Sequence, residues 1–336
     1  MVGAVIVQNG QVVGQGWHGE WGGPHAEVEA LQDAGARARG GTAYVSLEPC
    51  NHFGKTPPCS KALMEAGIGR VVYGAADPGE ASGGGGARLR TEGVQVQGPI
   101  LSREDARREN PVFFHPSPDE PWVCLKLAVS LDGGIAVREG ERTAITGPEV
   151  SARVHWLRAG VDAVLIGART ARVDDPLLTP RGELQPRIPP RRVILDGRGT
   201  LSPDLRLFRE GEGEVQVLTT SAASEPWLTQ MDARGARITV VPGREDRVEL
   251  KRALTQLRTE GIRSVLCEGG GVLASALLTE ELVHRVHLAI APRFLGQDRV
   301  PAFPEVDELP SRNGWNFAFP PEALGADLWL TLDREL

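Results

Sequence analysis

The chain has 336 residues, of which 37 are basic and 44 acidic, so its formal net charge at pH 7 is -7. This balance argues against a protein that holds a polyanion such as nucleic acid on a broad basic surface, although a few local arginines suffice for a small anionic substrate. Hydrophobic residues make up 41% of the chain and charged residues 24%, proportions typical of globular proteins, and the length favours two domains.

The N-terminal segment MVGAVIVQNGQVVGQGW has a short apolar run with neither a basic region before it nor a small-residue cleavage site after it. It therefore does not indicate a signal peptide. No apolar stretch approaches the roughly 20 residues that a membrane span needs. We expect a cytoplasmic protein, in which four cysteines are not a disulfide framework and a paired spacing suggests metal binding or catalysis.

The first third of the chain predicts an α/β unit. Asn9-Gly10 between two apolar segments is a strong hairpin signal. Periodicity predicts helices over 25–38 and 59–67 and strands over 42–47, 70–76 and 94–100, while the glycine-rich segment 77–86 predicts a flexible loop. Because helices and strands alternate, we expect a sheet layered by helices on both sides.

Prolines and turn formers over 115–121 mark the expected domain boundary. Beyond it, helix patterns recur at 150–160 and 249–261. Strand patterns recur at 122–130, 162–167, 191–197, 214–220, 237–243, 264–271 and 285–295. The chain is therefore expected to fold as one domain over 1–117 and a second α/β domain over 121–336.

Two of the four cysteines, Cys50 and Cys59, each follow a proline, and His25 and Glu27 begin the first expected helix. Zinc accepts one imidazole and two thiolates, and three protein ligands leave the fourth tetrahedral position for water, as in catalytic sites. Zinc can bring the pKa of that water to about 7, and Glu27 would carry the proton. The alternative is a closed structural site with His52 as the fourth ligand, which leaves Glu27 unexplained.

His-x-Glu followed by Pro-Cys and a second cysteine is the signature of zinc-dependent nucleobase deaminases, here with a longer spacing between the cysteines. With GWHGEWGGPHAE and SLEPCNHFGKTPPC, the first domain resembles the deaminase half of the bifunctional riboflavin-biosynthesis deaminase/reductases. The segments LKLAVSLDG, ITG, TARVDDPLLTPR and CEGGGVLASALL resemble the reductase half in the same order.

This resemblance implies a cytidine-deaminase-like three-layer domain followed by a dihydrofolate-reductase-like α/β domain. The first would hydrolytically deaminate a diaminopyrimidinone ribosylamino 5'-phosphate with zinc, and the second would reduce the ribosyl group to ribityl with NADPH. The expected cofactors are therefore Zn²⁺ and NADPH. The expected partner is a small phosphorylated pyrimidine, without nucleic acid or membrane, and a homo-oligomer is left open.

By the same resemblance, His25, Cys50 and Cys59 match the zinc ligands and Glu27 the proton-transfer acid. The positions that match substrate contacts are Lys126, Arg158, Leu178, Arg181 and Glu268. The positions that match NADPH contacts are Ala128, Thr170, Asp174, Gly270, Gly271, Val272, Leu273, Ala274, Ser275 and Ala276. Fork-shaped arginine donors suit a phosphate, and a glycine-rich turn from a strand into a helix can bring backbone N–H groups to a cofactor phosphate. The remaining cysteines, Cys124 and Cys267, are expected to be buried small hydrophobes.

Departures from the family pattern bear on both activities. The family's N-terminal helix and Pro-Asn-Pro segment do not precede the MVGAVIV match, so we expect either a misassigned start or a compromised deaminase. Arg142-Thr143-Ala144 replace the family's Ser-x-Trp, which removes an aromatic wall from the nicotinamide region, and the asparagine usual after Asp77-Pro78 is missing. The alternatives are a reductase with a compromised deaminase, a zinc deaminase of another nucleobase substrate, and a zinc-stabilised binding protein. Retention of Glu27 argues against the last.

Overall fold

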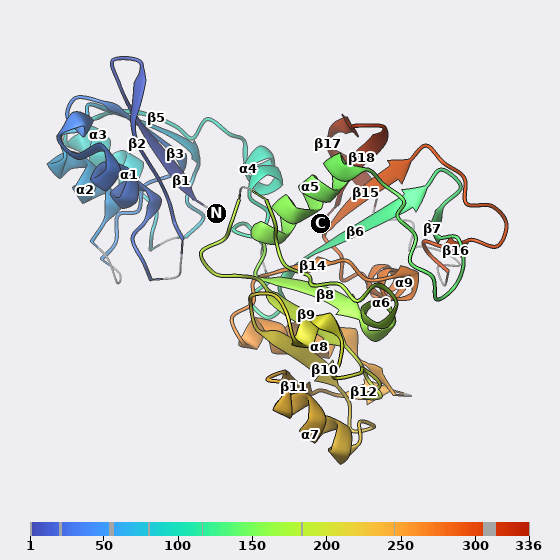
Figure 1. Ribbon diagram of the computed structural model, residues 1–336. Helices are drawn as coiled ribbons and strands as arrows, with labels where there is room; N and C mark the ends of the chain where they lie inside the picture. Colours follow the sequence, from blue (N-terminus) through green and yellow to red (C-terminus); the bar gives the residue numbers. More distant parts are fainter. Residues whose placement is uncertain are drawn as a thin grey trace. The chain divides into compact units, whose positions relative to one another are not determined.

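The structure, a computed structural model, describes residues 2–19, 22–53, 57–79, 81–115, 117–182, 184–244, 246–304 and 314–335. The chain divides into two compact units, Met1–Pro116 and Ser117–Leu336 (Figure 1). Each unit combines a sheet with helices, which confirms the predicted α/β class. Among the described helices, none has the length and apolarity of a membrane span.

The first unit is built on a five-stranded sheet in the order β2-β1-β3-β4-β5. Strand β1 pairs antiparallel with β2 and β3, whereas β3, β4 and β5 run parallel. The strands are β1 (Gly3–Gln8), β2 (Gln11–Trp17), β3 (Thr42–Leu47), β4 (Arg70–Ala75) and β5 (Gln95–Gln97). The helices are α1 (Ala26–Ala34) with the 3₁₀ turn η1 (Gly35–Ala38), α2 (Cys59–Glu65), α3 (Gly85–Thr91) and α4 (Arg103–Glu109).

Helix α1 lies against the sheet at a distance that only small residues allow. Its buried apolar residues are Ala26, Ala30 and Ala34, which are one turn apart. On β2, a Cβ atom at Gly14 would lie 2.3 Å from the carbonyl oxygen of Ala30, and one at Gly16 would lie 2.4 Å from the backbone nitrogen of Ala30. This close packing fixes the start of α1, where the zinc-ligand candidate His25 stands.

The second unit contains a nine-stranded sheet in the order β11-β10-β9-β8-β14-β6-β15-β18-β17. Neighbours from β11 to β15 are parallel, and β18 and β17 add an antiparallel hairpin. Its strands are β6 (Trp122–Ser130), β8 (Ala163–Gly167), β9 (Arg191–Leu195), β10 (Val215–Thr219), β11 (Arg237–Val240), β14 (Ser264–Cys267), β15 (Arg285–Ala291), β17 (Trp315–Leu324) and β18 (Asp327–Arg334). Two short pairs stand apart: β7 (Gly134–Ala136) with β16 (Val300–Pro301), and β12 (Gly243–Arg244) with β13 (Arg247–Val248).

Helices cover both faces of this sheet (Figure 1). Helices α8 (Leu250–Thr259) and α9 (Gly271–Thr279) pack with the side chains of one face in a single apolar core. Helices α6 (Ala168–Asp174) and α7 (Glu225–Ala233) pack on the other face, as does α5 (Pro148–Ala159); the 3₁₀ turn η2 (Arg206–Phe208) adds a buried leucine there. Because side chains alternate along β6, its even-numbered residues, Lys126 and Ala128 among them, lie on the α5 face.

The structure confirms one local expectation from the sequence and corrects others. The hairpin at Asn9-Gly10 is present, with both residues at positive φ. The segment 77–86, expected to be a loop throughout, ends in a helix, because α3 begins at Gly85. Thr170 and Asp174, two of the positions expected to contact NADPH, lie on helix α6.

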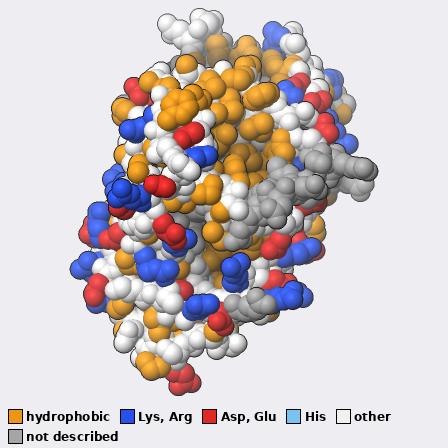
Figure 2. Space-filling view, turned by 90° about the vertical axis from the view of Figure 1, so that its right-hand side faces the viewer, with side chains coloured by type: hydrophobic (Ala, Val, Ile, Leu, Met, Phe, Trp, Pro, Cys, Tyr) orange, Lys and Arg blue, Asp and Glu red, His pale blue; other side chains and the backbone are white. Residues whose placement is uncertain are grey.

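One face of the molecule shows how its charges are distributed. Figure 2 shows apolar side chains gathered in its upper part and both signs of charge mixed over its lower part. On this face the acidic and basic residues are therefore mixed and do not form a surface of a single sign.

Candidate functional site

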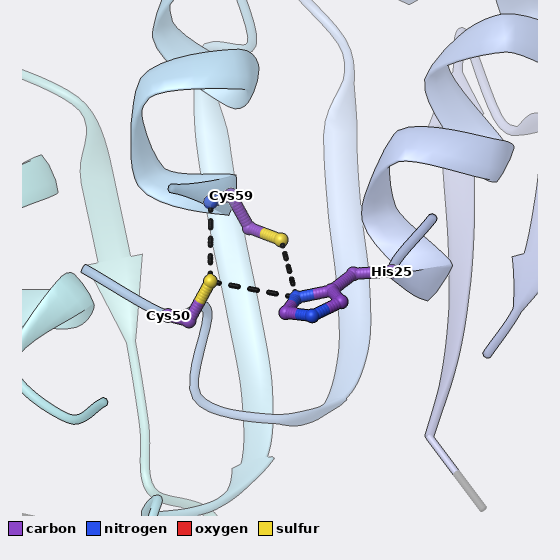
Figure 3. Close-up of side chains that lie close together, drawn as sticks. All are labelled: His25, Cys50 and Cys59. Atoms are coloured by element: carbon purple, nitrogen blue, oxygen red, sulfur yellow. Dashed lines mark hydrogen bonds between the residues drawn. The ribbon is translucent and has the colours of Figure 1, made fainter. Parts of the chain in front are cut away.

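His25, Cys50 and Cys59 come together in the first unit (Figure 3). His25 is the residue before α1, Cys50 lies in the loop after β3, and Cys59 is the first residue of α2. The Nδ1 atom of His25 lies 3.2 Å from the Sγ atom of Cys59 and 3.4 Å from that of Cys50. Ligand atoms from all three lie within 4.8 Å of one another. One nitrogen and two sulfurs at this spacing fit a tetrahedral zinc ion with one open position.

His52, the alternative fourth ligand, is not part of this cluster among the residues that the structure describes. Its buried Nδ1 atom has no hydrogen-bond partner there. The geometry therefore offers three protein ligands, the number typical of a catalytic zinc site.

The pKa values of Cys50, Cys59 and Glu27 are shifted in different directions by their surroundings. A hydrogen bond from Cys59, opposed by burial and reinforced by His25, lowers the pKa of Cys50 to about 4. The pKa of the Cys59 thiol is raised by its hydrogen bond to Cys50 and by burial. Glu27 is 4% exposed, and burial raises the pKa of its carboxyl to about 7. A buried carboxyl with a pKa near neutrality is suited to accept and release a proton.

The Cys50 loop is held by its neighbours. The backbone nitrogen of Ser60 donates to the carbonyl oxygen of Cys50 at 3.1 Å, and the Ser60 hydroxyl donates to Asn51 Oδ1 at 2.9 Å. The Asn51 nitrogen donates to the carbonyl oxygen of Ser82 at 3.0 Å. The glycine-rich segment therefore supports the metal-ligand loop, a role that its composition did not indicate.

His18, which was not singled out from the sequence, packs beside the ligand histidine. The ring centroids of His18 and His25 lie 5.3 Å apart, edge to face, and His18 Nδ1 lies 3.0 Å from the carbonyl oxygen of Pro24. Its place in the segment GWHGEWGGPHAE, close before the ligand histidine, was the available signal.

Three of the five substrate-site residues expected in the second unit meet at the centre of its sheet. Arg158 on α5 forms a two-pronged ion pair with Glu268, with Nε–Oε1 at 2.6 Å and Nη2–Oε2 at 2.8 Å. Burial lowers the pKa of Lys126 on β6, although Glu268 opposes this. Burial alone would raise the pKa of Glu268, but Arg158, Lys126 and His155 outweigh it and the pKa is lowered. The site therefore joins the Glu268 carboxylate to the Arg158 guanidinium, with the Lys126 amino group near enough to affect the pKa of Glu268.

The other two expected substrate residues differ in accessibility. Leu178 is 1% exposed and packs in the core, so it can offer only backbone atoms to a ligand, and its φ of 60° is rare for a leucine. Arg181 is exposed. The carbonyl oxygen of Thr179, between them, accepts from Arg158 Nη1 at 3.2 Å, which links this loop to the ion pair.

Only some of the residues expected to contact NADPH lie close together in the structure. Thr170 Oγ1 accepts a hydrogen bond from the backbone nitrogen of Gly270 at 3.0 Å, so α6 adjoins the start of α9. Asp174 is one turn beyond Thr170, and burial raises its pKa. Ala128 lies half-buried against the core under α5. Of these three residues, Thr170 is the one that contacts the start of α9, whose first N–H groups have no partner within the helix and suit a phosphate.

Within the 270–276 stretch, only the beginning can face a ligand. Ala274 and Ser275 are fully buried, and Ala276 packs against the core. Val272 is 39% exposed and Leu273 is partly buried. A Cβ atom at Gly271 would lie 2.8 Å from the carbonyl oxygens of Pro301 and Ala302, so this glycine serves the chain's own packing. Cys124 and Cys267 are buried, and burial raises the pKa of both thiols, as expected for inert core residues.

Comparisons with known proteins agree with the division of the chain into two units. Residues 1–75 match the cytidine and deoxycytidylate deaminase zinc-binding region, and residues 121–312 match the RibD C-terminal domain. The chain is 37% identical to the riboflavin biosynthesis protein RibD of Chlamydia pneumoniae over 89% of this chain and 80% of that protein. It is also 37% identical to RibD of Escherichia coli, over 88% and 83% of the two chains.

Solved structures give the same result over nearly the whole chain. RibD of Acinetobacter baumannii superposes with a TM-score of 0.78 at 34% identity, covering 100% of this chain and 92% of that one. A diaminohydroxyphosphoribosylaminopyrimidine deaminase/5-amino-6-(5-phosphoribosylamino)uracil reductase from Thermotoga maritima superposes with a TM-score of 0.80 at 31% identity, covering 99% and 91%. The chain therefore belongs to the RibD family of riboflavin-biosynthesis proteins, with a cytidine-deaminase-like unit followed by a RibD reductase unit.

Proposed function

We propose that this protein carries out two consecutive steps of riboflavin biosynthesis. The unit over 1–117 removes an amino group hydrolytically from a diaminopyrimidinone ribosylamino 5'-phosphate, and the unit over 121–336 reduces the ribosyl group of the product to ribityl with NADPH. The observation that carries the proposal is the three-ligand cluster with a buried carboxyl beside it, in a chain whose second half matches the RibD C-terminal domain. The protein would act in the cytoplasm.

In the first unit, His25, Cys50 and Cys59 would hold zinc, which supplies a water activated as hydroxide near neutral pH. Glu27 moves the proton. Because burial raises its pKa to about 7, the carboxylate can accept a proton from the attacking water and return one to the leaving amino group at the same pH. A merely structural zinc site has no use for such a carboxyl.

In the second unit, bound NADPH would be the source of the hydride that reduces the ribosyl carbon. The chain contributes orientation: Arg158 and Glu268 hold each other in one geometry, and the amino group of Lys126 lies near them. The loop at Thr179 is fixed to the same arginine. Fixed donors and an ionised carboxylate can position hydroxyl groups of a sugar phosphate for hydride transfer.

The test is to purify the chain with zinc and to measure ammonia release and NADPH oxidation separately, with the pyrimidine phosphate intermediates as substrates. Glu27→Gln should lower ammonia release roughly 10²-fold or more, because a general acid/base is lost. Zinc content and NADPH oxidation should not change. Glu65→Gln on α2, whose side chain is 67% exposed, is the matched control. Deamination at the parent rate in Glu27→Gln would contradict the assignment of this residue. NADPH oxidation without ammonia release in the parent protein would favour a reductase with a compromised deaminase.

A further inference from the structure

Glu48 lies two residues before the zinc-ligand candidate Cys50 and is not itself part of the ligand cluster. It stands directly after β3, at the carboxyl end of that strand, and it is partly buried. Strand β4 runs parallel beside β3, with Leu47 opposite Ala75, so the segment that contains Asp77 leaves the sheet at the same edge. Ligands of α/β sheets bind outside the carboxyl ends of the strands, which places Glu48 at the border of such a site.

The Glu48 carboxylate accepts two backbone N–H groups from the glycine-rich segment 77–86. Its Oε1 atom accepts from the nitrogen of Gly86 at 2.9 Å, and its Oε2 atom accepts from the nitrogen of Asp77 at 3.4 Å. These two donors stand at the two ends of the segment. One side chain therefore ties both ends of the segment to the start of the Cys50 loop.

The hydrogen bond to Gly86 takes the place of a helix cap. Helix α3 begins at Gly85, and its N-cap residue, Gly84, has no side chain that could accept the first free N–H groups of the helix. Glu48 supplies this acceptor from 38 residues away in the sequence. A Cβ atom at Gly86 would lie 3.1 Å from Glu48 Oε1 and 3.0 Å from the ring of Tyr73, so the absence of a side chain there makes room for the carboxylate.

The glycine-rich segment borders the zinc-ligand cluster. The carbonyl oxygen of Ser82 accepts from the nitrogen of Asn51, the residue after Cys50, at 3.0 Å. A hydrogen bond with Cys50, opposed by burial, raises the pKa of His25, and the charges of nearby groups, Asp77 among them, raise it further. Asp77 therefore lies within electrostatic reach of the ligand histidine. A molecule at the open zinc position has this segment as its neighbour.

We propose that Glu48 is a positioning residue of the deaminase, which sets the distance between the glycine-rich segment and the zinc site and thereby the affinity for the pyrimidine substrate. The Asp77 side chain moves with the segment, because its Oδ1 atom accepts from the nitrogen of Gly79 at 2.8 Å. Both oxygens of Glu48 accept backbone donors, so Glu48 acts through the segment and not on the reacting atoms. The inference rests on the proposed deamination, because it assigns a residue that shapes the substrate site of that reaction.

The Cys50 loop keeps its other supports when the Glu48 side chain is changed. The backbone nitrogen of Glu48 donates to the carbonyl oxygen of Ala75 at 2.8 Å, and the nitrogen of Ser60 donates to the carbonyl oxygen of Cys50 at 3.1 Å. Neither hydrogen bond involves the Glu48 carboxylate. Its loss should therefore release the glycine-rich segment and leave zinc bound.

The experiment measures ammonia release from the diaminopyrimidinone ribosylamino 5'-phosphate by the full-length zinc-loaded protein, by Glu48→Gln and by Glu48→Ala. Glutamine keeps one acceptor oxygen, whereas alanine keeps none. KM should rise about tenfold in Glu48→Gln and further in Glu48→Ala, because hydrogen bonds to a charged acceptor are lost, and kcat should change less than KM. Glu92→Gln, at the other end of α3, removes an exposed carboxylate that pairs with Arg88 at 2.7 Å and is the matched control.

Two further measurements do not depend on turnover. The Kd of the same substrate, measured by calorimetry in Glu27→Gln and in Glu27→Gln/Glu48→Gln, should rise by the same factor as KM. Hydrogen exchange at the backbone amides of Asp77 and Gly86 should be faster in Glu48→Gln, and zinc content should stay at the parent level.

The outcomes separate the role of Glu48 from the proposed deamination. A parent protein that releases no ammonia would overturn the proposed deamination and this inference with it. A parent protein that deaminates, with parental KM and Kd in Glu48→Gln, would overturn only the role of Glu48, and this variant decides the matter even where Glu48→Ala does not fold. Loss of zinc in Glu48→Gln, or a lower melting temperature with parental KM, would show that Glu48 supports the metal ligands or the fold and does not position the substrate site.

Discussion

Substitution of Gly85 by alanine tests how the glycine-rich segment supports the zinc site. A Cβ atom at this position would lie 1.8 Å from the carbonyl oxygen of Pro49, the residue before the ligand Cys50. Real Cβ contacts are essentially never shorter than 3.0 Å, so the two backbones must separate by about 1.2 Å, the difference between 3.0 and 1.8 Å. Metal–ligand distances tolerate only about 0.2 Å. Alanine should therefore displace Cys50.

Two effects of opposite sign compete in this variant. Gly85 is the first residue of α3, where alanine would favour the helix by up to about 1 kcal/mol. Overpacking against a fixed backbone costs about 1–3 kcal/mol, and here the contact is with backbone rather than with a flexible side chain. We expect the clash to dominate, with a lower melting temperature and zinc affinity reduced roughly 10- to 100-fold, as for other changes around metal ligands.

Zinc affinity is measured by competition with a chromophoric chelator, and stability by thermal denaturation. The control is Gly3→Ala on β1, where the nearest atom to an added Cβ is 3.9 Å away. Parental zinc affinity and melting temperature in Gly85→Ala would refute the reasoning. A lower melting temperature with parental zinc affinity would show that α3 moves and the Cys50 loop does not.

Three further changes test other parts of the structure. Cys59→Ser should lose most of its zinc, because a soft thiolate is replaced by a poor ligand, and full occupancy measured by atomic absorption would exclude Cys59 as a ligand. Gly270→Val should weaken NADPH binding in a fluorescence titration and leave zinc content unchanged, because a Cβ there lies 3.3 Å from Thr170 Oγ1 and crowds the α6–α9 junction; normal binding would show that this is only a structural turn. Burial, and then Arg285, Arg153 and Lys126, lower the pKa of His287 from 6.5 to about 3. Because folding lowers the pKa of His287, the neutral imidazole contributes its full stabilisation above pH 6.5. This stabilisation is lost as the pH falls towards 3, by about 1.4 kcal/mol per pH unit. Between pH 6.5 and 5, the parent should therefore lose about 2 kcal/mol more stability in urea denaturation than His287→Asn, and equal losses would contradict a buried neutral histidine.

The parts of the protein that the sequence could predict are those set by local chemistry. Asn9-Gly10 forms its hairpin because both residues accept positive φ, and the paired Pro-Cys motifs with His25 and Glu27 indicate zinc deamination through their residue types and spacing alone. Helix α3 could not be predicted in this way. Its first residue is a glycine, the residue least suited to a helix interior apart from proline, and the reason for glycine is the approach of the Pro49 carbonyl, which only the tertiary structure brings there.

The sequence also does not reveal which side chains of α9 face the core. The stretch from Gly270 to Ala276 was expected to contact the cofactor, yet Ala274 and Ser275 are fully buried in the structure. An apolar helix such as GVLASALLT has no polar face that would reveal which side meets the core. Only its packing against the sheet shows that a ligand can reach its first turn alone.

The arginines that line a cavity between helix α6, the turn after β9 and the β12–β13 hairpin also could not be grouped from the sequence. Arg172, Arg198 and Arg247 come from three separate segments, and each alone is an ordinary surface arginine. What distinguishes them is the contact at Gly197, where two backbones meet closely enough to align the residues that follow. A site assembled from charges that are distant in sequence leaves no local motif, so its chemistry can be recognised only after the fold has placed the three segments around one cavity.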